Sequence, residues 1–267
     1  MNLYHDSILK LHKMSKGKII VFSNIKGGAG KSTLSIHVAI DLMFRGYKVA
    51  VIDLDAKQGT TKNFYRDRLK NLSSHKPTPY CTFLHLSDID SRKFAYEEDD
   101  DNLKKTFQKL SNYDVIICDT SGNNDNNFSQ LSLKYADVVV SPLNPSYVDL
   151  SLFVYINKEK QKIIPGEYVE FIKKYTKEDL KWYVIPNRSS FNNTNYEKSI
   201  EILNMIKNDF NFKILSSIYD RFIYQQWFKI GLSCFDINIK NYKDPNSILN
   251  ARREINVIVD EILDELH

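Results

Sequence analysis

The sequence predicts an α/β fold in which helices cover both faces of a doubly wound, mostly parallel sheet. Short apolar runs alternate with amphipathic segments along the chain, as they do in successive strand–helix units. Each run is continuously apolar, and this pattern is typical of strands that are buried on both faces. The runs that we expect to form strands lie at residues 19–22, 49–53, 82–86, 115–119, 138–141 and 182–186.

Helical segments are expected between these strands. The first covers residues 32–45 and ends before a turn at Gly46, and two more cover residues 61–72 and 103–110. An acidic run at residues 97–101 is expected to form a solvated loop ahead of the last of these helices.

The length and composition of the chain suit one domain of this class. The chain has 267 residues, of which 42% are hydrophobic, and it contains no internal repeat or low-complexity linker. We expect a single domain over residues 18–267. Residues 1–17 are expected to be an N-terminal extension that is either disordered or an upstream start ahead of Met14.

Charge and cysteine content narrow the class of protein further. The net charge of +4 permits contact with nucleic acid without requiring it. The three cysteines form no CxxC pair, which argues against a disulfide framework or a zinc site and fits a reducing compartment. No run is long and apolar enough to span a bilayer, so we expect a cytoplasmic protein without a membrane partner.

A glycine-rich segment directly after the first predicted strand points to a phosphate-binding loop. Its glycines let backbone N–H groups approach a polyphosphate, Lys31 supplies a cation for the outer phosphates, and the Ser32 hydroxyl can ligate Mg²⁺ directly. A flexible glycine turn with solvated lysines is the alternative. The residues expected to bind nucleotide are Lys26, Gly27, Gly28, Ala29, Gly30, Lys31, Ser32 and Thr33.

Carboxylates follow two other predicted strands at the same edge of the sheet. Asp53 and Asp55 end the second apolar run, and Asp119 ends the run at residues 115–119. In a parallel α/β sheet, ligands bind outside the carboxyl ends of the strands, so these side chains should converge near the glycine-rich loop. Oxygen ligands of this kind suit Mg²⁺ beside a triphosphate.

The glycine-rich loop resembles the deviant Walker A motif of the ParA/MinD superfamily of P-loop ATPases. Ile25 stands where the common P-loop has a glycine, and Lys26 is a second lysine ahead of Gly27. The resemblance implies ATP and Mg²⁺ as cofactors and a homodimer that forms in ATP. In that dimer Lys26 reaches the partner's nucleotide, so the resemblance makes Lys26 and Lys31 catalytic residues.

The resemblance also assigns roles to the polar residues at the strand ends. It implies that Asp55 positions the attacking water, while Asp53 and Asp119 hold Mg²⁺ through water. It further implies that Asn187 reads the adenine ring, although an asparagine after a strand also favours a turn. In the related ATPases this segment usually reads Asp-Thr-Pro-Gly. Here Asp119 and Thr120 are followed by Ser121, which stands in place of the proline.

Several stretches resemble the MipZ family within this superfamily. Residues 53–59 have one residue more before the glutamine than ordinary ParA proteins, and further matches lie at residues 136–144, 146–149 and 220–224. This resemblance covers roughly residues 18–267. It implies a weak, Mg²⁺-dependent ATPase that positions the cell-division site by inhibiting assembly of FtsZ, and that couples to ParB and chromosomal DNA. It also implies association with the nucleoid and enrichment at the pole.

Other classes remain as alternatives. A ParA-type chromosome or plasmid partition ATPase would use the same site but would leave FtsZ alone. A MinD-like membrane-bound regulator would need a basic C-terminal helix, whereas residues 260–267 are acidic. An iron–sulfur ATPase would hold its cluster with cysteines, but Cys118 lies within a predicted strand and Cys81 near the start of another, so neither is placed as a cluster ligand. A binding module without hydrolysis would not need the full set of site residues.

DNA contacts are expected to be few. The candidates are Arg188, Lys198 and Arg221, and each of them could instead be a solvated side chain or a partner in an ion pair. Glu197 and Glu201 flank Lys198 and oppose a polyanion. Since non-specific affinity for DNA depends on the number of phosphates that basic residues neutralise, we expect this protein to bind DNA weakly.

Overall fold

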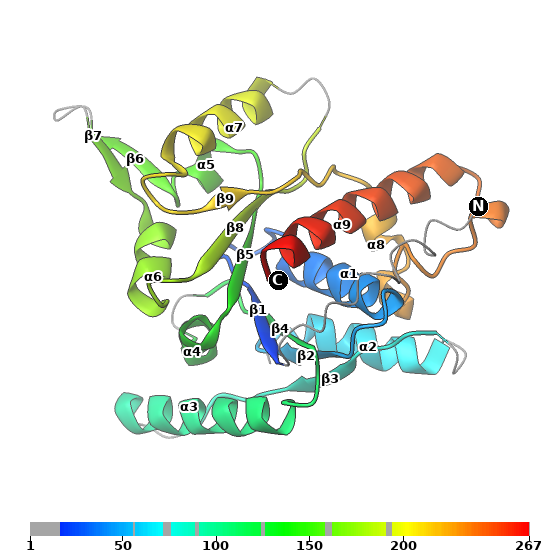
Figure 1. The fold of residues 1–267 in the computed structure, drawn as a ribbon, viewed down its shortest axis with the longest axis horizontal. Helices are drawn as coiled ribbons and strands as arrows, with labels where there is room; N and C mark the ends of the chain where they lie inside the picture. Colours follow the sequence, from blue (N-terminus) through cyan, green and yellow to red (C-terminus); the bar gives the residue numbers. More distant parts are fainter. Residues whose placement is uncertain are drawn as a thin grey trace.

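The computed structural model describes residues 17–55, 57–71, 76–88, 91–123, 126–157, 162–190 and 194–266. Its centre is a seven-stranded sheet in the order β3-β2-β4-β1-β5-β8-β9, with every neighbouring pair parallel (Figure 1). This confirms the predicted doubly wound fold. The strands are β1 (Lys18–Phe22), β2 (Val49–Asp53), β3 (Tyr80–Phe83), β4 (Val115–Asp119), β5 (Val138–Leu143), β8 (Lys181–Pro186) and β9 (Lys213–Ile214).

Helices cover the two faces of the sheet. One face packs against α1 (Lys31–Phe44), α2 (Thr60–Asn71), α8 (Ile223–Gln226) and α9 (Pro245–Leu266). The other packs against α3 (Arg92–Lys109), α4 (Asn127–Tyr135), α6 (Glu167–Tyr175) and α7 (Thr194–Ile206). Among the described residues the chain also forms the short helix α5 (Tyr147–Leu150) and an antiparallel hairpin of β6 (Val154–Asn157) and β7 (Lys162–Pro165).

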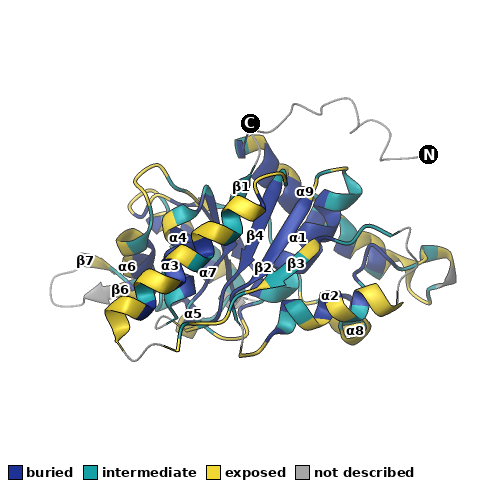
Figure 2. Cartoon of the chain, turned by 90° about the horizontal axis from the view of Figure 1, so that it is seen from below, coloured by how far each residue is buried: buried dark blue, intermediate teal, exposed yellow. Residues whose placement is uncertain are grey.

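The strands bury both faces, which explains their continuous hydrophobicity. In β1, Ile20 and Phe22 belong to the core beneath α1 and α9, whereas Val21 belongs to the core beneath α3 and α4. Alternate residues of a strand point to opposite faces, so a sheet covered twice needs apolar residues at successive positions. Figure 2 shows the central strands as buried and the outer faces of the helices as exposed.

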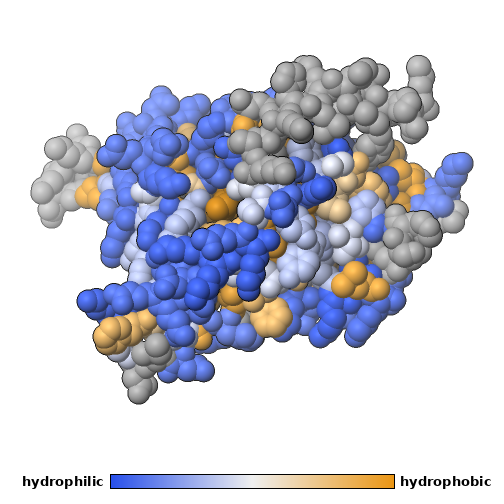
Figure 3. Space-filling view, turned by 60° about the horizontal axis from the view of Figure 1, so that its bottom comes forward, coloured by the Kyte–Doolittle hydropathy of each residue, from blue (hydrophilic) through white to orange (hydrophobic). Residues whose placement is uncertain are grey.

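The acidic run at residues 97–101 is helical, so the prediction of a solvated loop was wrong. Helix α3 begins at Arg92, eleven residues before the predicted start. Asp99 accepts hydrogen bonds from the Ser87 backbone N–H and the Asn127 side chain, both at 2.8 Å, and Asp100 forms an ion pair with Lys104 one turn later. Asp99 and Asp100 are thus buried with polar partners, whereas Glu97, Glu98 and Asp101 are exposed on the same helix. The face of the molecule that Figure 3 shows is largely hydrophilic, with scattered apolar residues.

Two further predictions concern the third strand and the N-terminal extension. The third strand occupies Tyr80–Phe83, whereas residues 82–86 were predicted. The predicted N-terminal extension lies outside the described residues, apart from Gly17.

The C-terminal helix packs on the core. Helix α9 lies alongside α1 (Figure 1), and its apolar face is buried against it at Ile255, Ile258, Val259 and Ile262. The acidic residues of α9 therefore belong to a packing helix whose apolar face is occupied. Within the described ranges no helix is both long and apolar enough to cross a membrane.

Helix α2 is anchored by a fully buried ion pair. Both nitrogens of the Arg68 guanidinium fork donate to Asp236, with N–O distances of 2.6 and 2.9 Å, and neither side chain is exposed. Arg68 also donates to the backbone carbonyls of Pro77 and Gly231. A Cβ on Gly231 would lie 2.1 Å from the Arg68 backbone nitrogen, so only glycine permits this close approach.

Candidate functional site

The predicted site residues meet at the carboxyl ends of three adjacent strands. Strand β4 lies between β1 and β2, and the strand register pairs Asp119 with Phe22 on one side and with Asp53 on the other. The glycine-rich loop leaves β1 directly after Phe22 and leads into α1. The two carboxylates and the loop therefore lie together at this edge of the sheet.

The loop has a backbone that requires glycine. Gly28 and Gly30 have φ values of 77° and 101°, in the left-handed region that other residues rarely adopt. Gly122, the glycine of the Asp-Thr-Ser-Gly segment after β4, packs against the same loop. A Cβ at this position would lie 2.9 Å from the Gly27 nitrogen.

Lys31 lies inside this loop rather than in solvent. Its side chain donates to the Lys26 carbonyl at 3.2 Å, and the residue is only 6% exposed. Burial lowers the pKa of Lys31, while the charges of Asp119 and Asp55 oppose this shift. A buried ammonium group in a glycine-rich loop that opens helix α1 favours an anion, and a phosphate fits this arrangement.

Both carboxylates at the ends of β2 and β4 are buried and held by hydrogen bonds. Asp53 accepts from the backbone N–H groups of Asp55 at 3.0 Å and Lys62 at 2.8 Å. Asp119 accepts through Oδ2 from the Thr61 hydroxyl at 2.5 Å. Its other oxygen, Oδ1, is buried and has no partner among the described residues.

Electrostatics at Asp119 favour a cation. The pKa of Asp119 is raised to about 7. Burial is the largest cause and the neighbouring Asp53 adds to it, while hydrogen bonds from Thr61 and Ser32 and the charge of Lys31 oppose the shift. A buried carboxylate with one orphaned oxygen and a serine hydroxyl beside it is a donor set that suits Mg²⁺. The residues present therefore fit the metal, with Ser32 as the expected direct ligand and Asp53 and Asp119 as the expected ligands through water.

Asp55 lies just outside this buried pair. It is partly exposed, and its side chain accepts from the Gln58 backbone N–H at 3.3 Å. The Gly59 N–H donates to the Asp55 carbonyl at 2.7 Å, which fixes the turn into α2. The role of Asp55 in positioning water stays a prediction.

Lys26 forms an ion pair within its own chain that the sequence did not reveal. Its ammonium group contacts Asp149 on α5, whose side chain is 1% exposed. Ser146 caps α5 by accepting from the Asp149 backbone N–H at 3.1 Å. Residues 146–149 were noted only as a family match, because no local pattern connects them with a lysine 123 positions earlier.

Asn187 supports the glycine-rich loop. Its side chain donates to the Ala29 carbonyl at 2.7 Å, and a Cβ on Gly30 would lie 2.2 Å from the Asn187 amide nitrogen. Its contact with adenine stays a prediction.

The three candidate DNA contacts differ in their surroundings. Arg188 and Lys198 are exposed, and Arg188 has a positive φ of 54°. Arg221 instead forms an ion pair with Glu254 at 2.6 Å, which matches the structural alternative considered for it. Its use in DNA binding stays a prediction.

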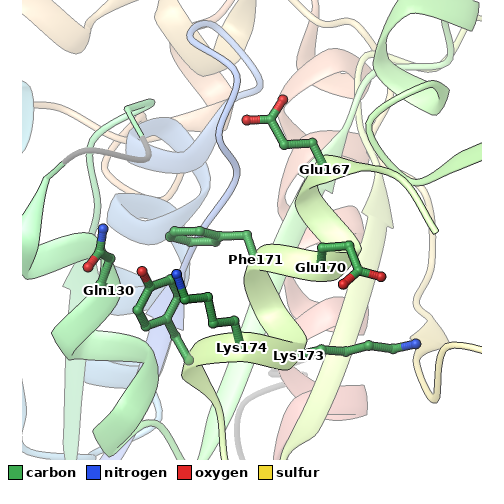
Figure 4. Close-up of a pocket in the computed structure, with 7 residues that line it drawn as sticks. Gln130, Glu167, Glu170, Phe171, Lys173 and Lys174 are labelled. Atoms are coloured by element: carbon green, nitrogen blue, oxygen red, sulfur yellow. The ribbon is translucent and has the colours of Figure 1, made fainter.

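A surface pocket lies apart from these residues. It is formed by α6 and the facing side of α4 (Figure 4), and none of the predicted site residues lines it. Its lining residues are Gln130, Glu167, Glu170, Phe171, Lys173, Lys174 and Tyr175.

Comparison with known proteins places the chain in a family. Septum site-determining protein MinD of Neisseria meningitidis is 27% identical over 146 residues, which are 48% of this chain and 54% of that protein. The matched stretch thus spans about half of this relative. A plasmid partition protein from Borrelia burgdorferi has a similar fold, with a TM-score of 0.60, 19% identity, and coverage of 94% of this chain and 99% of that chain.

A second Borrelia structure, a putative plasmid partition protein bound to AMPPNP, gives a TM-score of 0.58 at 22% identity. It covers 88% of this chain and 98% of its own. At these identities the two structures support the fold alone. The family model for the ATPase MipZ matches residues 18–264, nearly the whole chain. The chain therefore belongs to the MipZ family of ATPases.

Proposed function

We propose that this protein is an ATP-driven dimerising switch that positions the cell-division site by inhibiting FtsZ assembly. The observation that carries the proposal is the match to the MipZ family over residues 18–264. The site supports it, because a glycine-rich loop, a buried Lys31 and two carboxylates lie at adjacent strand ends. A ParA-type partition ATPase with the same site is the alternative.

The proposed chemistry is hydrolysis of ATP. Loop N–H groups and Lys31 would hold the phosphates, and Ser32, Asp53 and Asp119 would hold Mg²⁺, whose charge would neutralise the phosphates. Asp55 would orient the attacking water. The AMPPNP in the Borrelia relative is a nucleotide of the expected kind. We propose slow turnover, so that hydrolysis acts as a timer for the switch.

The proposed dimer requires Lys26 to change partner. In the single chain this lysine is paired with the buried Asp149. To complete the nucleotide site of a second copy, Lys26 would have to leave Asp149, and Asp149 would then need a replacement partner because an unpaired buried carboxylate is costly. Dimerisation is therefore proposed to depend on a bound triphosphate that attracts Lys26.

Sedimentation of FtsZ polymer tests the proposal. We expect polymer in the pellet to fall when this protein is added in ATP, and to stay unchanged in ADP. Lys26→Ala should bind ATP but remain a monomer in light scattering, and it should leave the FtsZ polymer intact. Lys109→Ala, at an exposed lysine on α3, is the control and should behave as the unchanged protein. An ATP-dependent dimer that leaves FtsZ unaffected would favour the partition ATPase.

DNA and ParB are proposed as further partners of the switch. On DNA we expect weak, non-specific binding through Arg188 and Lys198, because Glu254 already pairs with Arg221. In fluorescence anisotropy with a random duplex, Lys198→Ala should weaken binding and flatten its salt dependence by about one phosphate contact. Equal salt dependence of Lys198→Ala and the unchanged protein would remove Lys198 from the DNA surface.

Co-sedimentation with ParB tests the second proposed partner. If ParB does not co-sediment with this protein, the proposal is limited to FtsZ.

A further inference from the structure

The N-terminal turn of α2 holds both carboxylates of the candidate metal site. Asp53 accepts from the Lys62 backbone N–H, and Asp119 accepts from the Thr61 hydroxyl. The first N–H groups of a helix lack partners within the helix, so a carboxylate placed there satisfies them. The first turn of α2 thus orients Asp53 from β2 through a backbone N–H group and Asp119 from β4 through a hydroxyl group.

Thr61 occupies a core position of α2 although it is polar. The buried residues Thr61, Phe64, Tyr65 and Arg68 follow the spacing of one helical face, which packs toward the sheet and α1. Thr61 is completely buried, and its Oγ1 lies 2.5 Å from Asp119 Oδ2. The ion pair of Arg68 with Asp236 fixes the same face two turns later.

The hydroxyl of Thr61 can serve only as a donor to Asp119 in the ionised form that would bind a metal. When ionised, a carboxylate oxygen accepts and does not donate, so the proton of this hydrogen bond belongs to Thr61. With Oδ2 held, the buried oxygen of Asp119 that has no partner in the described part of the chain is Oδ1. The Ser32 hydroxyl also lowers the pKa of Asp119, but Ser32 is the residue expected to ligate the metal directly. Thr61 is therefore the donor left to hold this carboxylate.

We propose that Thr61 is a positioning residue of the magnesium site, acting by fixing Asp119 so that Oδ1 is available to the hydrated metal. The inference rests on the proposed function, because it assumes that the site takes a nucleotide with Mg²⁺. In this role Thr61 acts through Asp119 and is not itself a metal ligand. Partners of this kind hold ligands in orientation, and their loss typically weakens metal affinity by about 10- to 100-fold.

Titration of Mg²⁺ into the complex with fluorescent ADP tests this role without relying on turnover. Thr61→Val keeps the shape and removes the hydroxyl, and we expect the half-saturating Mg²⁺ concentration to rise by about 10-fold. Binding of the same nucleotide in EDTA should not change. Thr61→Ser keeps the donor and should restore Mg²⁺ affinity, which a purely steric role for the threonine methyl would not allow.

Matched controls separate this effect from a folding defect. Thr60→Val makes the same chemical change at the neighbouring, partly exposed position and should leave Mg²⁺ affinity unchanged. Thr61→Ala removes the hydroxyl with less bulk and should reproduce the loss if Thr61→Val folds poorly. Unfolding curves in EDTA show which variants are folded.

The outcomes are distinct. Mg²⁺ affinity of Thr61→Val and Thr61→Ala equal to that of the unchanged protein would overturn the inference while leaving the proposed function intact. The same holds if Thr61→Ser is as weak as Thr61→Val. If the unchanged protein binds no nucleotide in the presence of Mg²⁺, the proposed function fails, and the inference fails with it.

Discussion

Replacing Arg68 by alanine is expected to lower the free energy of unfolding by about 3–5 kcal/mol. The guanidinium is fully buried, and its removal would leave the Asp236 carboxylate without its cation in the core. Burial alone would raise the pKa of Asp236, but the hydrogen bonds and charge of Arg68 outweigh burial and hold this pKa below its usual value. The backbone carbonyls of Pro77 and Gly231 would lose a donor as well.

Urea denaturation followed by circular dichroism measures this loss. Arg66→Ala is the matched control, because Arg66 lies on the same helix but its ion pair with Asp67 is largely solvent-exposed. The denaturation midpoint of Arg66→Ala should stay close to that of the unchanged protein. A midpoint for Arg68→Ala equal to that of Arg66→Ala would show that the buried pair contributes little.

Arg68 also shows where reasoning from sequence ends. The pattern of residues 61–72 indicated a helix, and α2 covers Thr60–Asn71. However, two of the buried positions of this helix, Thr61 and Arg68, are polar, so hydrophobic periodicity could not mark them as core. Their partners, Asp119 and Asp236, lie 58 and 168 positions away.

The central strands and the glycine-rich loop could be predicted because their causes are local. A strand covered on both faces requires a run of apolar residues, and the turn before Lys31 requires glycines with positive φ. Both requirements produce a sequence pattern within a few neighbouring positions. The convergence of Asp53 and Asp119 was also predictable, because parallel strands end at a common edge.

Contacts between distant segments were not predictable in this way. The helix over the acidic run depends on tertiary partners such as Asn127, and the pairing of Lys26 with Asp149 depends on where α5 lies. The hairpin of β6 and β7 was also missed. Several of its apolar residues are exposed, for example Tyr155 and Ile164.

Replacing Asp55 by alanine is expected to slow ATP turnover by about 100-fold or more while leaving ATP binding and dimerisation in place. The expectation follows from the separation of tasks within the site. The buried Asp53 and Asp119 carry the hydrogen bonds from α2, whereas Asp55 is partly exposed and keeps its carboxylate outside that pair. Its removal therefore leaves the predicted metal ligands and the phosphate loop intact.

Phosphate release under single-turnover conditions, with light scattering on the same samples, checks this result. Asp88→Ala, at an exposed aspartate after β3, controls for the general loss of a carboxylate and should turn over ATP normally. Unchanged turnover in Asp55→Ala would remove this residue from the catalytic role. If turnover falls and the dimer persists, Asp55→Ala should inhibit FtsZ assembly for longer after a single addition of ATP. Lys26→Ala should fail to inhibit it at all, because the first variant blocks the exit from the dimer and the second blocks its formation.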